Sequence, residues 1–381
     1  MFIGVYSWLN PLELPPGTEL LIFRSSAICD MKVCMPMASI WNRAPNKPSE
    51  RGKRVLTLAL LFLGATAALP VHGSDSASPG LRADSSAARH PFLYAGEWDT
   101  RKAYQSIFLV REGKIKWQYS VPLRTATGGV QEFDDATLLS NGNIIFSRMS
   151  GAGEITPEKN LVWEYATPPG TEVHSIQCIS DGLLLVMRNG NPPKAIIFDT
   201  VSNKIEREIT IPCAVTNTHV QFRHVRMTKA GTLLVPHLGE GKVVEYDLEG
   251  KALWSVEAKS PWSAVRLRNG NTLIAGDWSR YAREVNPQGD TVWEFTQKDV
   301  PEEKLGNIQT AGRLANGNTV MCCWIAGDNN TSHWPGTVQV FEVTSEKHVV
   351  WALSSWKDPD LGPATSIQLL DEPGPSEAAE R

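Results

Sequence analysis

Three of the eight histidines stand beside apolar runs that are predicted to be strands. His174 and His219 precede such runs, and His237 follows one. Imidazole titrates near neutral pH and can act as acid, base or nucleophile. We therefore take His174 or His219 as the candidate catalytic residue. Carboxylates hold similar positions, and the acidic partner that orients the imidazole would be Glu132 or Asp277.

Arginines and tryptophans at matching positions indicate the kind of ligand. Arginine binds carboxylate, sulfate or phosphate through paired N–H donors, and the flat face of an indole suits a sugar ring. The candidate anion-binding residues are Arg148, Arg188 and Arg223, the candidate ring platform is Trp262, Trp278 and Trp324, and further candidate ligand contacts are Trp98, Gln221, His237, Asn307 and Gln309. Together they predict a pocket for a small polar ligand, carbohydrate-like or anionic.

A three-histidine metal site is another conceivable use of His174, His219 and His237. Zinc sites that can be recognised from sequence have ligands at short spacings, and these three residues do not. We therefore expect no metal ion and no cofactor.

A recurring motif predicts the framework that positions these residues. Each copy has an apolar run, an Asn-Gly turn, a second apolar run and, further on, a strand that carries a tryptophan. The clearest hairpins are Thr137–Phe146, Val265–Ile274 and Arg313–Met321, and the strands that follow them are Leu161–Tyr165, Thr291–Phe295 and Val349–Leu353. A repeat of roughly 40–50 residues built from short strands is typical of a β-propeller. We expect type I′ turns at the Asn-Gly pairs, with positive φ at both central residues, and tryptophans packed between blades.

The hairpins predict six blades of four antiparallel strands. First and second strands are expected to pair at about 137–147, 176–186, 225–235, 265–275 and 311–322. The remaining blade is split, because Phe92–Trp98 resembles a second strand and Thr365–Leu370 a first strand. Their pairing would close the ring and leave no open sheet edge. We expect an all-β fold over 91–372, with seven blades as the alternative.

Chain direction predicts where the chemically active side chains meet. In each blade the first strand runs from one face, which we call the top, and the second strand returns to it. The Asn-Gly turns then lie at the bottom. Residues before first strands and after second strands should converge on the top rim, and Glu97 and Asp134 belong to this set as well.

Several segments resemble known propeller families. The Gly-x-x-x-Trp spacing of Gly250–Trp254 and Gly289–Trp293 resembles the quinoprotein (PQQ-like) superfamily. The Asn-Gly-Asn hairpins followed by Val-Trp-Glu strands resemble arylsulfotransferase-type propellers. His219–His224 and Met321–Asp328 are similar to exported bacterial six-bladed propellers of unassigned function. The resemblance spans about 92–372 and implies a fold more than an activity.

The PQQ-like resemblance also raises the question of a quinone. Quinoprotein dehydrogenases of this superfamily have eight blades and a vicinal pair of cysteines beside PQQ. Cys322 and Cys323 form such a pair, but they lie inside an apparent strand, where adjacent side chains face opposite ways. We therefore do not expect PQQ.

The first ninety residues differ in composition from the rest. Arg43–Arg54 is basic, and Val55–Leu69 is an apolar run that is short for a membrane span. This pattern predicts a signal peptide over 37–73, with an uncleaved anchor as the alternative. Residues 1–36 are interpreted as non-structural or as preceding the true start, 74–90 as a flexible linker and 373–381 as a disordered tail. An exported protein, periplasmic or extracellular, is expected.

Charge excludes one class of partner. The net charge is −4 and no basic stripe is present, so nucleic acid is not expected. We expect a monomer that meets a membrane only through the signal segment and binds a small molecule or a glycan.

Three hypotheses for the function remain open. The leading one is an exported propeller that binds a small polar ligand on its top face. The second is an arylsulfotransferase-like or polysaccharide-lyase-type enzyme that uses a rim histidine. The third is an interaction scaffold of the cell envelope, whose top face meets another protein. Whether the protein is an enzyme is left open.

Overall fold

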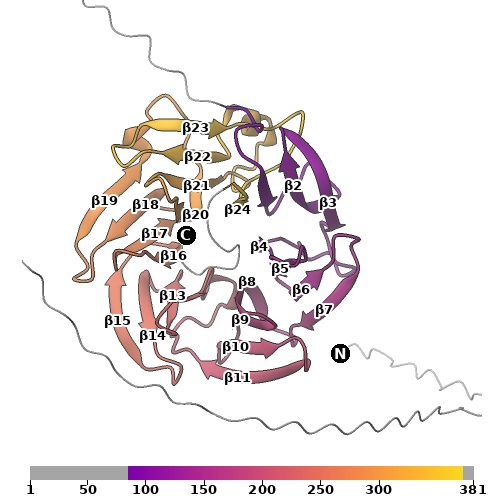
Figure 1. Cartoon of the computed structure of the whole chain (residues 1–381), viewed down its shortest axis with the longest axis vertical. Helices are drawn as coiled ribbons and strands as arrows, with labels where there is room; N and C mark the ends of the chain where they lie inside the picture. The colour runs from indigo at the N-terminus through magenta and orange to yellow at the C-terminus, as the bar shows by residue number, and fades with distance from the viewer. Residues whose placement is uncertain (1–84, 372–381) are drawn as a thin grey trace, which may run out of the picture. The chain divides into compact units, whose positions relative to one another are not determined.

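The computed structural model describes residues 85–371, which form six four-stranded antiparallel sheets arranged in a ring (Figure 1). The helices in this part of the chain are the short 3-10 helices η1 (Thr218–Val220), η2 (Gln297–Asp299) and η3 (Thr331–Gly336). The predicted six-bladed β-propeller is confirmed, and the alternative of seven blades is wrong. No helix in the described range is long and apolar enough to cross a membrane.

The strands follow one pattern in every blade, and the strand nearest the axis is given first. The first blade has β24 (Ser366–Leu369), β1 (Phe92–Ala95), β2 (Tyr104–Arg111) and β3 (Lys114–Pro122), and the second has β4 (Asp135–Leu138), β5 (Ile144–Arg148), β6 (Gly151–Ile155) and β7 (Leu161–Ala166). The third has β8 (Glu172–Ser180), β9 (Leu183–Asn189), β10 (Lys194–Asp199) and β11 (Lys204–Thr210), and the fourth has β12 (Arg226–Met227), β13 (Leu233–His237), β14 (Lys242–Tyr246) and β15 (Ala252–Glu257). The fifth has β16 (Pro261–Arg266), β17 (Thr272–Gly276), β18 (Tyr281–Val285) and β19 (Thr291–Thr296), and the sixth has β20 (Asn307–Arg313), β21 (Thr319–Trp324), β22 (Val340–Val343) and β23 (Val349–Leu353).

The ring closes as the split repeat predicted. β24, near the C-terminal end of the described chain, pairs antiparallel with β1, and Leu93 lies opposite Gln368. The two middle strands of each blade are buried on both faces because neighbouring blades cover them, which explains their dense apolar runs. In β13, for example, every residue from Leu233 to His237 is buried.

Tryptophans in the fourth strands of four blades join each of these blades to a neighbouring segment. The indole N–H of Trp117 donates to the carbonyl of Pro157, that of Trp254 to Pro287, and that of Trp293 to Ser345, over 2.6, 2.8 and 2.8 Å. Each acceptor lies in the turn between the third and fourth strands of the following blade. Trp351 of the sixth blade donates to Ser86 over 2.9 Å. The tryptophans therefore pack between blades, as predicted.

The Asn-Gly turns differ from the prediction. Gly142, Gly270 and Gly317 have φ values of 89°, 85° and 89°, but none of the preceding asparagines is among the described residues with positive φ. Both central residues of a type I′ turn need positive φ, so these are not type I′ turns. The loops are one residue longer, because the glycine N–H donates to the carbonyl three residues earlier, as Gly142 does to Leu139 over 3.0 Å. The side-chain oxygen of each asparagine, Oδ1, accepts a hydrogen bond from the backbone amide two residues further on, and this bond stabilises the longer loop.

The vicinal cysteines lie in the interior of β21. Cys322 packs with Trp351 against the first blade, and Cys323 packs with Phe295 and Phe341 on the opposite face. Both are thiols, and burial raises the pKa of each. Their opposed directions follow from strand alternation, as expected.

The predicted N-terminal and C-terminal segments fall mostly outside the described part of the chain. These are residues 1–36, the signal peptide over 37–73 and the tail over 373–381. Of the predicted linker, only Ser85–His90 is described, and it lies against the sixth blade. There His90 lies 3.1 Å from Glu342 of β22.

Candidate functional site

Polar side chains from all six blades meet at the top of the ring. We call this set the mouth cluster, and it consists of Glu97, Glu132, Asp134, Glu172, His174, His219, Arg223, Asp277 and Gln309. The members lie before or at the start of innermost strands, or just after second strands, as chain polarity requires. Most are fully buried, and only Glu172 and His219 have side chains with substantial exposure, 21% and 37%.

His174, in β8, is the centre of the cluster. Its Nδ1 atom lies 3.3 Å from Glu132 Oε1 and 3.2 Å from Asp134 Oδ2. Its Nε2 atom hydrogen-bonds to Glu172 Oε2 at 2.8 Å. One imidazole thus contacts three carboxylates from two blades.

Glu172 bridges the two candidate catalytic histidines. The oxygen that contacts His174 also hydrogen-bonds to His219 Nδ1 at 3.0 Å, and the two rings meet edge to face. The second nitrogen of His219 faces Arg223 Nη2 at 3.3 Å. The Arg223 guanidinium lies over the buried ring of Trp262, 4.6 Å from its centroid. This arrangement orients His219 from below and leaves one side of its ring open to solvent.

The opposite side of the mouth carries amides and tryptophans. Gln309 Nε2 donates to Glu97 Oε1 over 2.8 Å, and Trp324 Nε1 donates to the Glu97 carbonyl over 3.3 Å. Trp98 donates to Glu132 through its indole N–H. Both tryptophans are partly exposed and form a rim above buried acids.

Several polar atoms of the cluster are buried without a partner. Within residues 85–371, no hydrogen bond reaches Glu97 Oε2, Asp134 Oδ1, Asp277 Oδ1 or Gln309 Oε1. The same holds for the donors Arg223 Nε and Trp262 Nε1. Burying such groups without partners lowers stability by about 1–3 kcal/mol each.

The neighbouring carboxyl groups of Glu97, Glu132 and Asp134 have pKa values that are shifted in different directions. Burial and the charge of Glu132 raise the pKa of Glu97 well above its usual value. Burial also acts to raise the pKa of Glu132, but contact with His174 outweighs it and lowers that pKa. Burial and the charge of Glu132 raise the pKa of Asp134. The repulsion between neighbouring carboxylates therefore keeps one of them protonated.

His174 and Asp277 have shifted pKa values with opposite consequences. Burial and the charge of Arg223 act to lower the pKa of His174, but Asp134 and Glu132 raise it to about 10. His174 is then an imidazolium at neutral pH, which disfavours the role of base. Burial raises the pKa of Asp277 to about 7 against the opposing charge of Arg223. That value suits a group that transfers protons near neutral pH.

Other predicted site residues have different partners. Arg148 donates to Glu164 over 2.9 Å, and Arg188 donates to the Tyr165 hydroxyl over 3.3 Å. Gln221 bonds to the backbone of Gly190 over 2.8 and 3.0 Å and supports a loop.

Three further predictions lie at the edge of the mouth or beyond it. Asn307 accepts from Arg280 over 3.3 Å and neighbours Asp277. Trp278 is 59% exposed. His237 belongs to a separate group with Glu240 and does not join His174 and His219, so the structure does not form the three-histidine site considered from the sequence.

Glu172 is the one member of the mouth cluster that the sequence reasoning missed. It stands two residues before His174, so strand alternation places both side chains on one face of β8. That spacing was the available signal.

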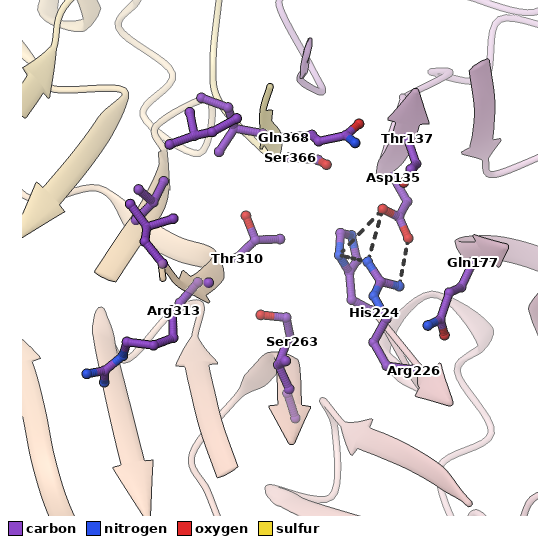
Figure 2. A pocket seen from close by; sticks show the side chains of 18 of the residues that line it. Asp135, Thr137, Gln177, His224, Arg226, Ser263, Thr310, Arg313, Ser366 and Gln368 are labelled. Atoms are coloured by element: carbon purple, nitrogen blue, oxygen red, sulfur yellow. Dashed lines mark hydrogen bonds and ion pairs between the residues drawn. The ribbon is translucent and has the colours of Figure 1, made fainter. Parts of the chain in front are cut away.

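A second polar region lies inside the ring and was not predicted. A cavity of about 440 Å³ is lined by innermost strands and reaches the bottom turns at Asn269 and Ala315. Figure 2 shows Asp135, His224 and Arg226 together on one side of it, with Thr310 facing them across open space. We call this space the channel cavity.

The buried carboxylates that line the channel cavity are paired, Asp135 with Arg226 and Glu284 with Arg313. Arg226 binds Asp135 through both guanidinium nitrogens, at 2.8 and 3.1 Å, and Asp135 Oδ2 accepts from the amide of Ile176 over 3.2 Å. His224 contacts the carbonyl of Asp134 at 2.8 Å, and burial lowers its pKa to about 4. These contacts indicate a structural role for His224.

Comparisons with known proteins identify the fold. No family model and no curated protein matches the chain. A protein of unknown function from Bacteroides caccae is 25% identical in sequence, with a TM-score of 0.63 over 73% of this chain and 98% of that one. A catalytically inactive virginiamycin B lyase from Staphylococcus aureus with quinupristin is 14% identical, with a TM-score of 0.48 over 71% and 86%. BamB from Moraxella catarrhalis is 12% identical, with a TM-score of 0.39 over 58% and 67%.

The similarity to the Bacteroides caccae protein supports the fold over nearly the whole of that chain. It does not favour the PQQ-like or the arylsulfotransferase-type families over other propellers.

Proposed function

We propose that the protein binds a small polyhydroxylated, carbohydrate-like ligand at the mouth cluster. The observation that carries the proposal is the set of buried, incompletely paired acids beneath a partly exposed rim of His219, Glu172, Trp98 and Trp324. Such a cluster lowers stability, and groups of this kind concentrate at functional sites. A ligand contacts the rim directly, while the buried groups fix its orientation and charge.

The unpartnered atoms favour hydroxyl groups over an anion. They include both acceptors, such as Gln309 Oε1, and donors, such as Arg223 Nε. A hydroxyl can donate and accept, whereas an anion only accepts. The anionic alternative has less support because Arg148 and Arg188 already have partners and Arg223 lies among carboxylates. A sulfate-transferring enzyme has less support for the same reason.

Acid–base catalysis of a lyase or related type is the second candidate function. It is favoured by two groups in one mouth, the oriented and partly exposed His219 and the Asp277 carboxyl with a pKa of about 7. A reaction that removes a proton from one side of a ligand and returns it on the other needs two such groups.

A thermal-shift screen against neutral sugars, uronates and sulfated phenols tests the binding proposal. A ligand at 100 times its dissociation constant stabilises the fold by about 2.7 kcal/mol. We expect neutral sugars to raise the melting temperature of the wild type and to leave that of His219→Ala unchanged. His348→Ala is the matched control, because His348 is exposed beside the turn between β22 and β23, at the opposite end of the blades.

Two outcomes would overturn the carbohydrate proposal. Stabilisation by uronates or sulfated phenols alone would indicate an anion site. No shift with any compound, together with recovery of one stoichiometric protein partner, would favour the scaffold hypothesis.

A further inference from the structure

A second group of potential metal ligands lies on the top side of the ring, apart from the mouth cluster. It consists of Cys213, His237 and Glu240. His237 is the last residue of β13, Glu240 lies in the turn that follows, and Cys213 lies in the segment between β11 and η1. One ligand atom from each residue lies within 4.8 Å of the other two. Three side chains from two blades thus converge on one point.

His237 is already oriented as a metal-binding histidine would be. Its Nε2 atom is hydrogen-bonded to the Tyr246 hydroxyl at 3.0 Å, which leaves Nδ1 facing Glu240 Oε2 at 2.7 Å. Ligating histidines usually have their second nitrogen held in this way. In the free protein Nδ1 donates its hydrogen to the Glu240 carboxylate. A metal ion at Nδ1 requires the other tautomer, with the hydrogen on Nε2, where the Tyr246 hydroxyl oxygen can accept it.

Glu240 is fixed by its other oxygen. Its Oε1 atom accepts from the amide of Ala214 over 2.7 Å, which leaves Oε2 to face His237. The ammonium group of Lys242 also lies 3.0 Å from Oε2. Burial acts to raise the pKa of Glu240, but these contacts lower it, so the carboxylate is ionised.

Cys213 adds a soft donor next to the nitrogen and the oxygen. Its strongest contact in the described chain is a long one, from the thiol to the carbonyl of Val215 at 3.7 Å. Burial raises the pKa of this thiol, so binding a metal would release a proton from it. The residue is only half-buried, which provides a path from solvent.

We propose that Cys213, His237 and Glu240 bind a divalent transition-metal ion of the zinc class, with water as the fourth ligand. Sulfur, imidazole and carboxylate in one tetrahedral set are typical zinc ligands. Bond lengths of about 2.0–2.3 Å place neighbouring ligand atoms about 3.3–3.8 Å apart. The 2.7 Å contact between His237 and Glu240 therefore widens slightly when the ion replaces the hydrogen between them. The exposed end of Lys242 turns away to solvent.

A bound ion would link the segment between β11 and η1, which contains Cys213, to the turn after β13, which contains Glu240. The segment 211–217 leads into η1, which carries His219 to the mouth cluster. It already approaches the turn after β13 closely, because a Cβ on Gly239 would lie 3.2 Å from a side-chain methyl carbon of Val215. A metal bond between Cys213 and that turn would hold this approach in place. The metal site does not depend on the proposed ligand at the mouth.

Cobalt substitution of the full-length, tag-free protein tests the site. Stoichiometric Co²⁺ should give the intense visible bands of a tetrahedral ion and a near-ultraviolet charge-transfer band from a thiolate. Cys213→Ser should lose the charge-transfer band, and His237→Gln should lower the affinity at least tenfold. Cys178→Ser, which changes another buried cysteine of the third blade, is the control and should keep the spectrum.

A second measurement uses the wild type alone, in case a variant does not fold. Zn²⁺ should protect Cys213 from alkylation in peptide mapping, whereas Mg²⁺ should not. The proposal is overturned if Co²⁺ gives no thiolate band, if the band persists in Cys213→Ser, or if Zn²⁺ leaves the alkylation rate of Cys213 unchanged.

Discussion

Asp134 and Asp135 are adjacent in the chain and lie in two different environments. Asp135 faces the channel cavity, where Arg226 and the amide of Ile176 satisfy its oxygens. Asp134 faces the mouth cluster, where its Oδ2 shares the Nδ1 atom of His174 with Glu132, its Oδ1 lacks a hydrogen bond within the described chain, and the charge of Glu132 lies nearby. Both carboxylates are fully buried.

The contrast separates structural charges from candidate functional ones. A buried ion pair with complete hydrogen bonding holds two blades in register, and it leaves nothing for a ligand to satisfy. A crowded set of acids with open acceptors is strained in the free protein and gains partners when a ligand arrives. We therefore assign the proposed ligand to the mouth cluster and a structural role to the paired charges of the channel cavity.

The largest change in the free energy of unfolding is expected when the charge of Asp135 is removed. Asp135→Asn leaves Arg226 without its partner inside the ring, and we expect a loss of about 3 kcal/mol in the free energy of unfolding. Urea denaturation measures it, with Gln177→Ala as a channel control that removes no charge. A loss below about 1 kcal/mol would contradict the structural role of this pair.

The pH dependence of stability should come from Asp277. Its pKa is about 7 in the folded protein against 3.8 for an unburied aspartate. The stabilising contribution of the protonated form is complete below pH 3.8 and is lost as the pH rises to about 7.

The Asp277→Asn variant isolates this contribution. Relative to the variant, the wild type should lose on the order of 2 kcal/mol of unfolding free energy between pH 4 and pH 7.5. Urea denaturation across this range gives both curves. Parallel curves would show that Asp277 titrates normally and would remove it as a proton-transfer candidate.

Ligand binding should distinguish the two regions. We expect His219→Ala to weaken the binding of a sugar found by the thermal-shift screen at least tenfold, or about 1.4 kcal/mol. Thr310→Val, in the channel cavity, should leave the dissociation constant unchanged. Isothermal titration calorimetry measures both constants. The opposite pattern would move the ligand site from the mouth to the channel.

The smallest change in the free energy of unfolding is expected for Asp134→Asn. Its sign is opposite to that expected for Asp135→Asn. Burial and the charge of Glu132 disfavour the ionised form of Asp134. The neutral amide should therefore stabilise the fold by about 1 kcal/mol at pH 8. Destabilisation as large as that of Asp135→Asn would mean that the two regions do not differ in kind.

The sequence was sufficient for most of the fold. Asn-Gly hairpins and Trp-bearing strands recur at near-constant spacing, and such local patterns determine the strands, the blade count and the closure of β24 on β1. The turn type was predicted wrongly because an asparagine side chain can stabilise a longer loop by accepting from a nearby amide.

The candidate site could be predicted only in part. The repeat determines the direction of each strand, and strand direction was enough to predict that His174, His219, Arg223 and Gln309 lie on one face of the ring. Whether an arginine there is available or paired depends on side chains from other strands, as the contact between Arg148 and Glu164 shows.

The sequence by itself determined the repeat, the strand polarity and the face on which the polar residues gather, because these follow from residue order within each blade. Only the tertiary structure decided which charges became partners. Asp134 and Asp135 have the same chemistry and adjacent positions, yet Asp134 shares one histidine nitrogen with a second acid, whereas Asp135 forms a two-contact pair with Arg226. Alternation sends them to opposite sides of the chain, and the environment on each side is built by residues from other blades, such as His174 and Arg226.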